Sequence, residues 1–214
     1  MTSPAAPDVE LAACSKRFGE RIALRRVTLR IAGGETVALM GANGSGKSTL
    51  LRICAGLVRP SAGEARIAGV RAIDVSETRR AATGYVAHRS QLYRGLSGRE
   101  NLELFARLYR APAAAAATTL DRVGLASRAD DRIEGYSRGM LQRLALARAI
   151  VHAPSLLLLD EPATGLDREG AVLLEELLGE LRGAVTVVVA THDPAFAARA
   201  ADRVVELRGG ELVA

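Results

Sequence analysis

The 214-residue chain is long enough for one well-packed domain with an inserted subdomain, and its 49% apolar and 25% charged residues are typical of a folded globular protein. Its net charge of +5 comes from arginines spread along the chain with few aromatic residues among them, so no nucleic-acid-binding surface is indicated. No apolar run approaches the ~18 residues of a membrane helix, and residues 1–7 lack the features of a secretion signal, so we expect a cytoplasmic protein.

The N-terminal part of the chain predicts two half-exposed antiparallel strands at 9–13 and 27–31, where apolar and polar side chains nearly alternate. Between them, Phe18 lies on a polar turn, where we expect an exposed ring, although a ring folded onto the strands is an equal alternative. A glycine turn then leads to a short apolar strand at 35–40. We expect the two antiparallel strands to flank it. Cys14 and Cys54 are interpreted as small buried hydrophobic residues.

Residues 41–49 read Gly-Ala-Asn-Gly-Ser-Gly-Lys-Ser-Thr and fit the phosphate-loop pattern G-x-x-x-x-G-K-[ST]. The apolar strand before them and an apolar helix after them, at 49–53, supply the context that the pattern requires. Its glycines let successive backbone N–H groups point at phosphate oxygens, at the positive end of the following helix. Lys47 would reach the β- and γ-phosphates, and the Ser48 hydroxyl would bind Mg²⁺. The alternative is a glycine-rich turn without a ligand. The loop residues expected to bind nucleotide are Gly41, Asn43, Gly44, Ser45, Gly46, Lys47, Ser48 and Thr49.

The middle of the chain changes from strands to helices. Short strands are predicted at 63–69 and 84–87, and a capping box at 97–100 begins an amphipathic helix. An alanine-rich helix at 113–120 follows, and a longer one begins near Ser137 and continues to 150. The section from about 90 to 150 is therefore predicted to be a helical insertion in an α/β chain.

The C-terminal part predicts a parallel sheet with helices on both faces. Residues 156–160 form a continuous apolar run that ends in acid, the pattern of a buried strand. Asp160 at its end can hold Mg²⁺ through water, and Glu161 can polarise an attacking water, whereas two solvated acids are the alternative. The remaining predicted elements are a helix at 168–182, a strand at 185–190, a helix at 195–201 and a hairpin of 203–207 with 211–213.

A second anion site is predicted at Ser137, because its hydroxyl and nearby backbone N–H groups would converge at a positive helix end, with small Gly139 beside them. An ordinary N-cap is the alternative. The order of motifs favours the anion site: a phosphate loop, this capped serine, the strand that ends in Asp160 and Glu161, and then His192 after a strand.

In this order the motifs resemble the ATP-binding subunit of an ABC transporter over essentially the whole chain. The resemblance equates 41–48 with Walker A, 156–160 with Walker B, 137–140 with the LSGGQ signature and 163–167 with the D-loop. Glu161 then matches the catalytic glutamate, His192 the switch histidine and Phe18 the aromatic residue that stacks on adenine.

The resemblance implies a P-loop, RecA-like core with a flanking antiparallel β subdomain and an inserted helical subdomain, at about 90–150 of a single 1–214 domain. It implies ATP and Mg²⁺ as ligands, and a head-to-tail homodimer or paired ATPase that sandwiches two ATP molecules. Ser137 and Gly139 of one subunit would then cap the γ-phosphate held by Lys47 of the other. It also implies an integral membrane partner, at the cytoplasmic face of the inner membrane.

Several positions depart from the family pattern. His88 stands where a Mg²⁺-ligating glutamine is usual; it is a poorer direct ligand and would act through water, with Gln91 as the alternative. Tyr136, Arg138 and Met140 replace a leucine, a glycine and a glutamine of the signature. Arg138 would either add positive charge near the γ-phosphate or face solvent.

The short chain, the loop at 88–93 and the signature at 137–140 resemble the ATPase subunit of the haem exporter of bacterial cytochrome c maturation. ATPase subunits of drug, lipid and polysaccharide exporters are alternatives. A soluble ABC ATPase acting on ribosomes or DNA usually carries two such domains or a long coiled-coil insert, neither of which is found in this sequence. A regulatory module that binds ATP without turnover would differ in its response to Glu161→Gln.

Overall fold

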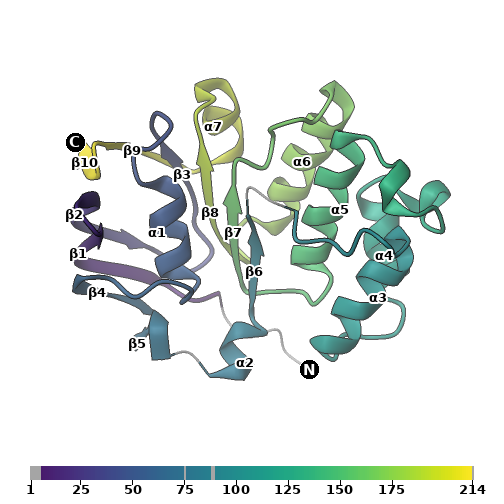
Figure 1. Cartoon of the computed structure of the whole chain (residues 1–214), viewed down its shortest axis with the longest axis horizontal. Coiled ribbons are helices and arrows are strands. Elements are labelled where there is room, and N and C mark those ends of the chain that lie inside the picture. Colours follow the sequence, from purple (N-terminus) through teal and green to yellow (C-terminus); the bar gives the residue numbers. More distant parts are fainter. Residues whose placement is uncertain (1–5, 75, 88–89, 214) are drawn as a thin grey trace.

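The computed structural model describes residues 6–74, 76–87 and 90–213, and within these ranges the strands form two sheets (Figure 1). The larger sheet has six strands in the order β10-β9-β3-β8-β7-β6, and the smaller has four in the order β2-β1-β4-β5. In the larger sheet the strands are β3 (Thr36–Met40), β6 (Thr83–Val86), β7 (Leu156–Asp160), β8 (Thr186–Thr191), β9 (Arg203–Arg208) and β10 (Glu211–Val213). The smaller contains β1 (Val9–Phe18), β2 (Arg21–Ile31), β4 (Ala62–Ile67) and β5 (Val70–Arg71).

The larger sheet is parallel except for β10, and its central strands β3, β8 and β7 are buried on both faces. Leu156 and Leu158 of β7 pack in one core cluster with α1 (Lys47–Cys54) and the smaller sheet. Leu157 and Leu159 point the other way and pack against α5 (Arg138–Ile150), α6 (Arg168–Leu181) and α7 (Pro194–Ala200). The prediction of a parallel sheet with helices on both faces is confirmed. A continuous apolar run is what such a strand requires, because neither face meets water.

The prediction that the two N-terminal strands flank the phosphate-loop strand is wrong. β9 and β8 pair with β3 on its two sides, while β1 pairs with β2 and β4 in the separate antiparallel sheet. The alternating pattern of these strands indicates that one face is exposed to solvent. Such strands fit a sheet that packs on α1 with only one of its faces. The structure also adds β5 and the short helix α2 (Glu77–Arg80), neither of which the sequence pattern predicts.

The two cysteines are buried in the core between this antiparallel sheet and α1, as predicted. Burial raises the pKa of the Cys14 thiol to about 11 and that of Cys54 to about 12. Both are therefore neutral thiols at physiological pH and act as small apolar residues.

The predicted helices between about 90 and 150 are present as α3 (Gly98–Leu108), α4 (Ala115–Arg122) and α5. The predicted capping box begins α3: Ser97 Oγ accepts from the Glu100 N–H at 3.1 Å, and Glu100 Oε2 accepts from the Ser97 N–H at 2.7 Å. Leu102, Leu120 and Leu144 join the three helices in a core cluster of their own. Among the described residues, no helix has both the length and the apolar character that crossing a membrane would require.

Candidate functional site

The phosphate loop connects β3 to α1 and packs against β2 and β9. Gly41 and Gly46 have φ values of 151° and 114°, which side chains disfavour. A Cβ on Gly46 would lie 2.5 Å from the Ala23 carbonyl oxygen, and one on Gly41 would lie 2.2 Å from that of Leu207. Both positions therefore require glycine, and the loop backbone takes up a defined curve.

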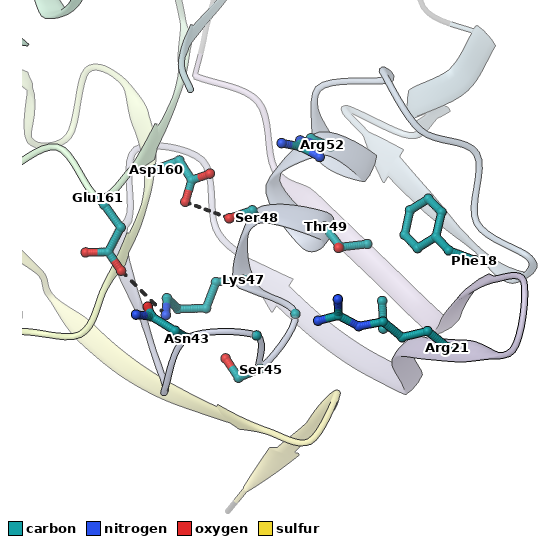
Figure 2. A pocket seen from close by; sticks show the side chains of 13 residues that line it. Phe18, Arg21, Asn43, Ser45, Lys47, Ser48, Thr49, Arg52, Asp160 and Glu161 are labelled. Atoms are coloured by element: carbon teal, nitrogen blue, oxygen red, sulfur yellow. Dashed lines mark hydrogen bonds and ion pairs between the residues drawn. The ribbon is translucent and has the colours of Figure 1, made fainter. Parts of the chain in front are cut away.

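A cavity of about 520 Å³ lies along this loop, and Figure 2 shows the side chains around it. Phe18 and Arg21 are at one end, Lys47 and Glu161 are at the other, and Thr49 lies between them. Phe18 is 48% exposed, as one of the two readings of the sequence expected, and Lys16 Nζ lies 4.9 Å from its ring centroid. The predicted site residues that line the cavity are Phe18, Asn43, Gly44, Ser45, Gly46, Lys47, Ser48, Thr49, Asp160 and Glu161.

Lys47 places a buried positive charge at the end of the cavity, with only 5% of the residue exposed. Its Nζ donates to the carbonyl oxygen of Gly41 at 2.6 Å and to that of Ala42 at 3.3 Å, and it lies 3.5 Å from Glu161 Oε1. The first loop residue thus contributes through its carbonyl group, which holds the lysine in place. A cation that is held in place and largely shielded from water interacts strongly with an anion in the cavity.

Two side chains with potential oxygen ligands for a metal ion lie in contact beside this lysine. Ser48 Oγ donates to Asp160 Oδ1 at 3.0 Å, across the gap between α1 and the end of β7, and Asp160 is 2% exposed. A hydroxyl and a carboxylate are the hard oxygen ligands that Mg²⁺ prefers. Within the described residues no three His, Cys, Asp or Glu side chains are grouped as a metal site. A Mg²⁺ ion would therefore depend on further oxygens from a phosphate ligand and water, as is usual for this ion.

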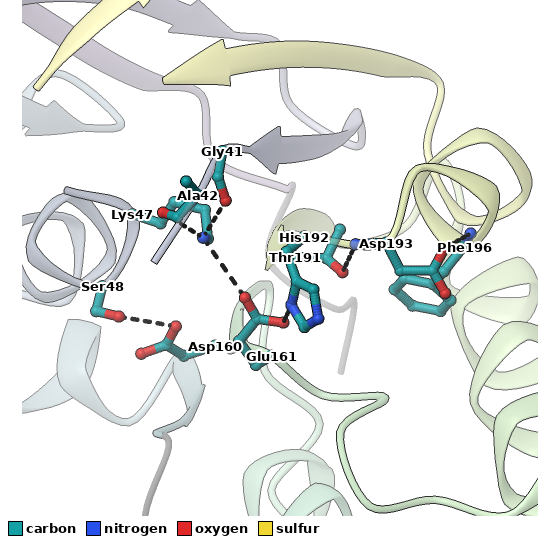
Figure 3. Close-up of polar contacts among 10 residues, drawn as sticks. All are labelled: Gly41, Ala42, Lys47, Ser48, Asp160, Glu161, Thr191, His192, Asp193 and Phe196. Atoms are coloured by element: carbon teal, nitrogen blue, oxygen red, sulfur yellow. Dashed lines mark hydrogen bonds and ion pairs between the residues drawn. The ribbon is translucent and has the colours of Figure 1, made fainter. Parts of the chain in front are cut away.

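Glu161 and His192 approach one another from the ends of neighbouring strands (Figure 3). His192 Nδ1 lies 2.8 Å from Glu161 Oε2, and the Glu161 side chain is only 15% exposed. The next residue fixes the direction of the chain: Asp193 Oδ1 caps α7 by accepting from the N–H groups of Ala195 and Phe196 at 2.9 and 3.1 Å. The carboxylate that was predicted to polarise water is thus held at the cavity by a histidine on one side and a lysine on the other.

The predicted second anion site lies apart from this cavity. Ser137 caps α5 as expected, with Oγ accepting from the Met140 N–H at 3.2 Å, but neither Ser137 nor Gly139 lines the cavity along the phosphate loop. Arg138 lies against the D-loop: a Cβ on Gly165 would come within 2.6 Å of its Nε.

The other departures from the family pattern fall in different surroundings. Tyr136 is 7% exposed, and its hydroxyl donates to the Arg128 carbonyl oxygen at 2.6 Å, so it is part of the core of the helical section. His88 lies outside the described residues. Gln91 Oε1 accepts from Arg148 Nη1 at 3.3 Å and lines a second cavity, away from the phosphate loop.

Three residues that line the main cavity were not predicted from the sequence: Arg21, Ala23 and Arg52. The first two belong to β2. They reach the loop because the chain turns back immediately after Phe18, where β1 ends. The short turn at Gly19 and Glu20 is the signal that could have indicated this, since a tight hairpin places Arg21 opposite Phe18. Arg52, one helical turn beyond Ser48, carries no signal that separates it from an ordinary exposed arginine.

Comparison with known proteins gives one consistent family. The family model described as "ABC transporter" matches residues 24–164. The chain is 42% identical to the lipoprotein-releasing system ATP-binding protein LolD 1 of Rhodospirillum rubrum, over 87% of each chain. It is 37% identical to the Nod factor export ATP-binding protein I of Rhizobium johnstonii, over 96% of this chain and 68% of the relative.

A longer relative and a solved structure extend the comparison. The macrolide export ATP-binding/permease protein MacB of Rhodopseudomonas palustris is 41% identical over 90% of this chain, which spans only 31% of that protein. A dimeric ATP-binding cassette solved in a post-hydrolysis state with ADP and Pi superimposes with a TM-score of 0.85 at 32% identity, over 96% of this chain and 97% of the other.

Proposed function

The chain belongs to the ABC transporter family, and we propose that it is the ATP-hydrolysing subunit that powers an exporter through a separate membrane protein. One observation supports the enzymatic role above all others: the Glu161 carboxylate lies between Lys47 and His192 at the end of a cavity that also contains the Ser48–Asp160 pair. A base, a phosphate-binding lysine and a pair of hard oxygen donors are the parts that hydrolysis of a nucleoside triphosphate requires.

Each group of residues in the cavity has a separate role in ATP hydrolysis. The loop N–H groups and Lys47 bind the β- and γ-phosphates, and Ser48 and Asp160 would hold Mg²⁺, directly or through water. When bound, this ion supplies positive charge that offsets the charge developing on the phosphates. Glu161 orients and polarises the attacking water, and His192 keeps the carboxylate aimed at it through the 2.8 Å contact. Phe18 stacks on the base at the open end of the cavity.

The position of Ser137 supports a dimer as the working form. Its hydroxyl lies at the N-terminus of α5, where a helix favours an anion, yet neither Ser137 nor Gly139 lines the cavity along the phosphate loop of the same chain. In a head-to-tail pair, Ser137 and Gly139 of one copy would cap the γ-phosphate held by Lys47 of the other. The dimeric solved relative supports this arrangement by analogy.

A surface between the core and the helical section supports docking to a membrane protein at the cytoplasmic face. A cavity of about 230 Å³ lies there, lined among others by Leu57, Tyr109 and Arg148. Leu57 is 62% exposed and Leu108, at the end of α3, is 67% exposed. Exposed apolar side chains beside a hollow are typical of a contact site for another protein. The ATP-binding/permease relative joins both functions in one protein by its name.

Crosslinking tests this contact. Both native cysteines are buried, so a new surface cysteine reacts selectively. Leu108→Cys should crosslink to an integral membrane protein in membranes of the native host, and mass spectrometry would identify that protein. The matched control is Val172→Cys, which places the thiol on α6, where the native side chain is 49% exposed. Crosslinks from Val172→Cys alone, or to ribosomal proteins, would contradict the proposal.

For the cargo we propose haem, on the resemblance of the loop at 88–93 and of the signature at 137–140 to the haem exporter ATPase. The relatives named above are associated by name with lipoprotein, Nod factor and macrolide, and these cargo classes are the competing candidates. The complex with its membrane subunit, reconstituted in liposomes, should hydrolyse ATP faster when haem is added. Stimulation by a macrolide or a lipoprotein, and not by haem, would overturn this choice of cargo.

A further inference from the structure

Arg21 is a charged cavity residue to which the phosphate-loop chemistry assigns no role. It begins β2, pairs in the hairpin with Phe18, and lines the same cavity as the loop. Its Nη2 would lie 3.4 Å from a Cβ on Gly44, so the guanidinium is beside the backbone of the loop itself. Figure 2 shows the side chain pointing from the Phe18 end of the cavity toward the loop.

The Arg21 guanidinium is also without a protein partner among the described residues. The nearest carboxylate in sequence, Glu20, accepts from Arg17 Nη2 at 3.0 Å. Arg52, the other arginine of the cavity, lies beside Tyr85: burial raises the pKa of that phenol, and the charge of Arg52 opposes the rise. Arg21 therefore offers a free fork of N–H donors to whatever enters the cavity.

We propose that Arg21 binds the α-phosphate of the nucleotide, an inference that rests on the ATP-binding function proposed above. In the bound nucleotide, the base lies on Phe18 and the terminal phosphates reach Lys47 and Ser48. The α-phosphate, which joins the nucleoside to the other phosphates, then lies beside Arg21. The planar guanidinium matches two phosphate oxygens at once. Arg21 and Lys47 then hold the polyphosphate from its two ends.

The consequence is a nucleotide site that does not depend on the γ-phosphate alone. AMP and ADP both carry the α-phosphate, so Arg21 adds to the affinity for each, whereas adenosine gains nothing from it. Phe18 contributes equally to all three, because all three carry the base. The two residues can therefore be told apart by their effect on a series of ligands.

The experiment measures the affinity of the full chain for adenosine, AMP and ADP by competition against a fluorescent ADP analogue. Arg21→Gln, Arg21→Lys and Phe18→Ala are compared with the native chain. The matched control is Arg30→Gln, which removes the same charge from an exposed position on the same strand, outside the cavity. Thermal unfolding of each variant checks that the fold is retained.

Arg21→Gln should weaken AMP and ADP by about tenfold and leave adenosine unchanged, since one charge-assisted hydrogen-bonded contact is lost. Arg21→Lys should fall between that variant and the native chain, and Phe18→Ala should weaken all three ligands. Unchanged AMP affinity in Arg21→Gln, or an equal loss for adenosine, would overturn the assignment of Arg21 alone. A native chain that binds neither ADP nor ATP would instead overturn the proposed function, and the role of Arg21 with it.

Discussion

His192 Nδ1 lies 2.8 Å from Glu161 Oε2, although 31 residues separate the two in the sequence. Each residue follows the end of a buried strand, and these strands, β7 and β8, are neighbours in the sheet. The contact therefore depends on the parallel sheet, which brings the two strand ends to the same edge. It gives a carboxylate near solvent a fixed direction, which a general base needs in order to align one water molecule.

Glu161→Gln should abolish turnover while ATP still binds. The amide keeps the shape of the side chain but removes the base, a change expected to lower the rate of hydrolysis by about 10²- to 10⁴-fold. It also removes the carboxylate that faces Lys47, so ATP affinity should not fall. Phosphate release and size-exclusion chromatography with ATP would measure both effects, and the ATP-bound dimer should accumulate.

The matched control for that change is Glu176→Gln, which neutralises an exposed glutamate on α6. It should hydrolyse ATP at the native rate. If Glu161→Gln also kept the native rate, Glu161 would not be the base. A native chain that binds ATP but shows no turnover, even with its membrane partner, would favour the regulatory alternative.

His192→Ala should lower kcat and leave the affinity for ATP nearly unchanged, because the histidine contacts Glu161 and does not line the cavity along the loop. Loss of a positioning contact to the base is expected to cost about tenfold or more in kcat. Steady-state hydrolysis with separate determination of ATP binding would distinguish the two effects. His192→Gln, which can still donate to the carboxylate, should retain part of the activity. A variant with native kcat and weakened ATP binding would argue for direct contact with the nucleotide.

Tyr136→Phe should lower the free energy of unfolding by about 1 kcal/mol, because the buried hydroxyl donates to the Arg128 carbonyl oxygen at 2.6 Å. Chemical denaturation measures this change. Tyr93→Phe is the control, since that tyrosine is 55% exposed and should tolerate the loss of its hydroxyl. Equal stability of the two variants would show that the buried hydrogen bond contributes nothing net.

His152 should make the protein less stable in mild acid. Burial is the main cause that lowers its pKa from 6.5 to about 4, and Tyr109 stacks on the ring at a centroid distance of 4.2 Å. Above pH 6.5 the histidine is neutral in both the folded and the unfolded chain, so it imposes no penalty. As the pH falls toward 4, the unfolded chain takes up the proton first, and stability is lost, by about 2 kcal/mol at pH 5.

The measurement compares the free energy of unfolding at pH 7.5 and pH 5 in the native chain and in His152→Gln. Both proteins share every other titrating group, so the difference between their pH responses isolates His152. The native chain should lose more stability than the variant over this range. Identical pH responses would show that the histidine protonates in the folded state as readily as in the unfolded chain.

Much of the site could be predicted from the sequence, because its chemistry lies in short continuous segments. The phosphate loop and the acidic end of β7 each combine a pattern with the neighbouring strand that positions it. The pairing of β3 with β8 and β9 could not be predicted, because these strands are far from β3 in the sequence. Local patterns indicate that a strand forms but not which strand becomes its neighbour. For Arg138 the sequence left open a position near the γ-phosphate or in solvent. The side chain is exposed and lies against Gly165 of the D-loop, a contact that local patterns do not predict.

The backbone at Glu161 has φ of 54°, a left-handed conformation unusual for this residue type. In an extended strand, Asp160 and Glu161 would point to opposite faces of the sheet. The left-handed turn lets both line one cavity, with Asp160 directed to Ser48 and Glu161 to Lys47. The two acids therefore form a unit whose spacing cannot vary. Insertion of a single residue between them should remove metal binding or water activation, however well the rest of the chain folds.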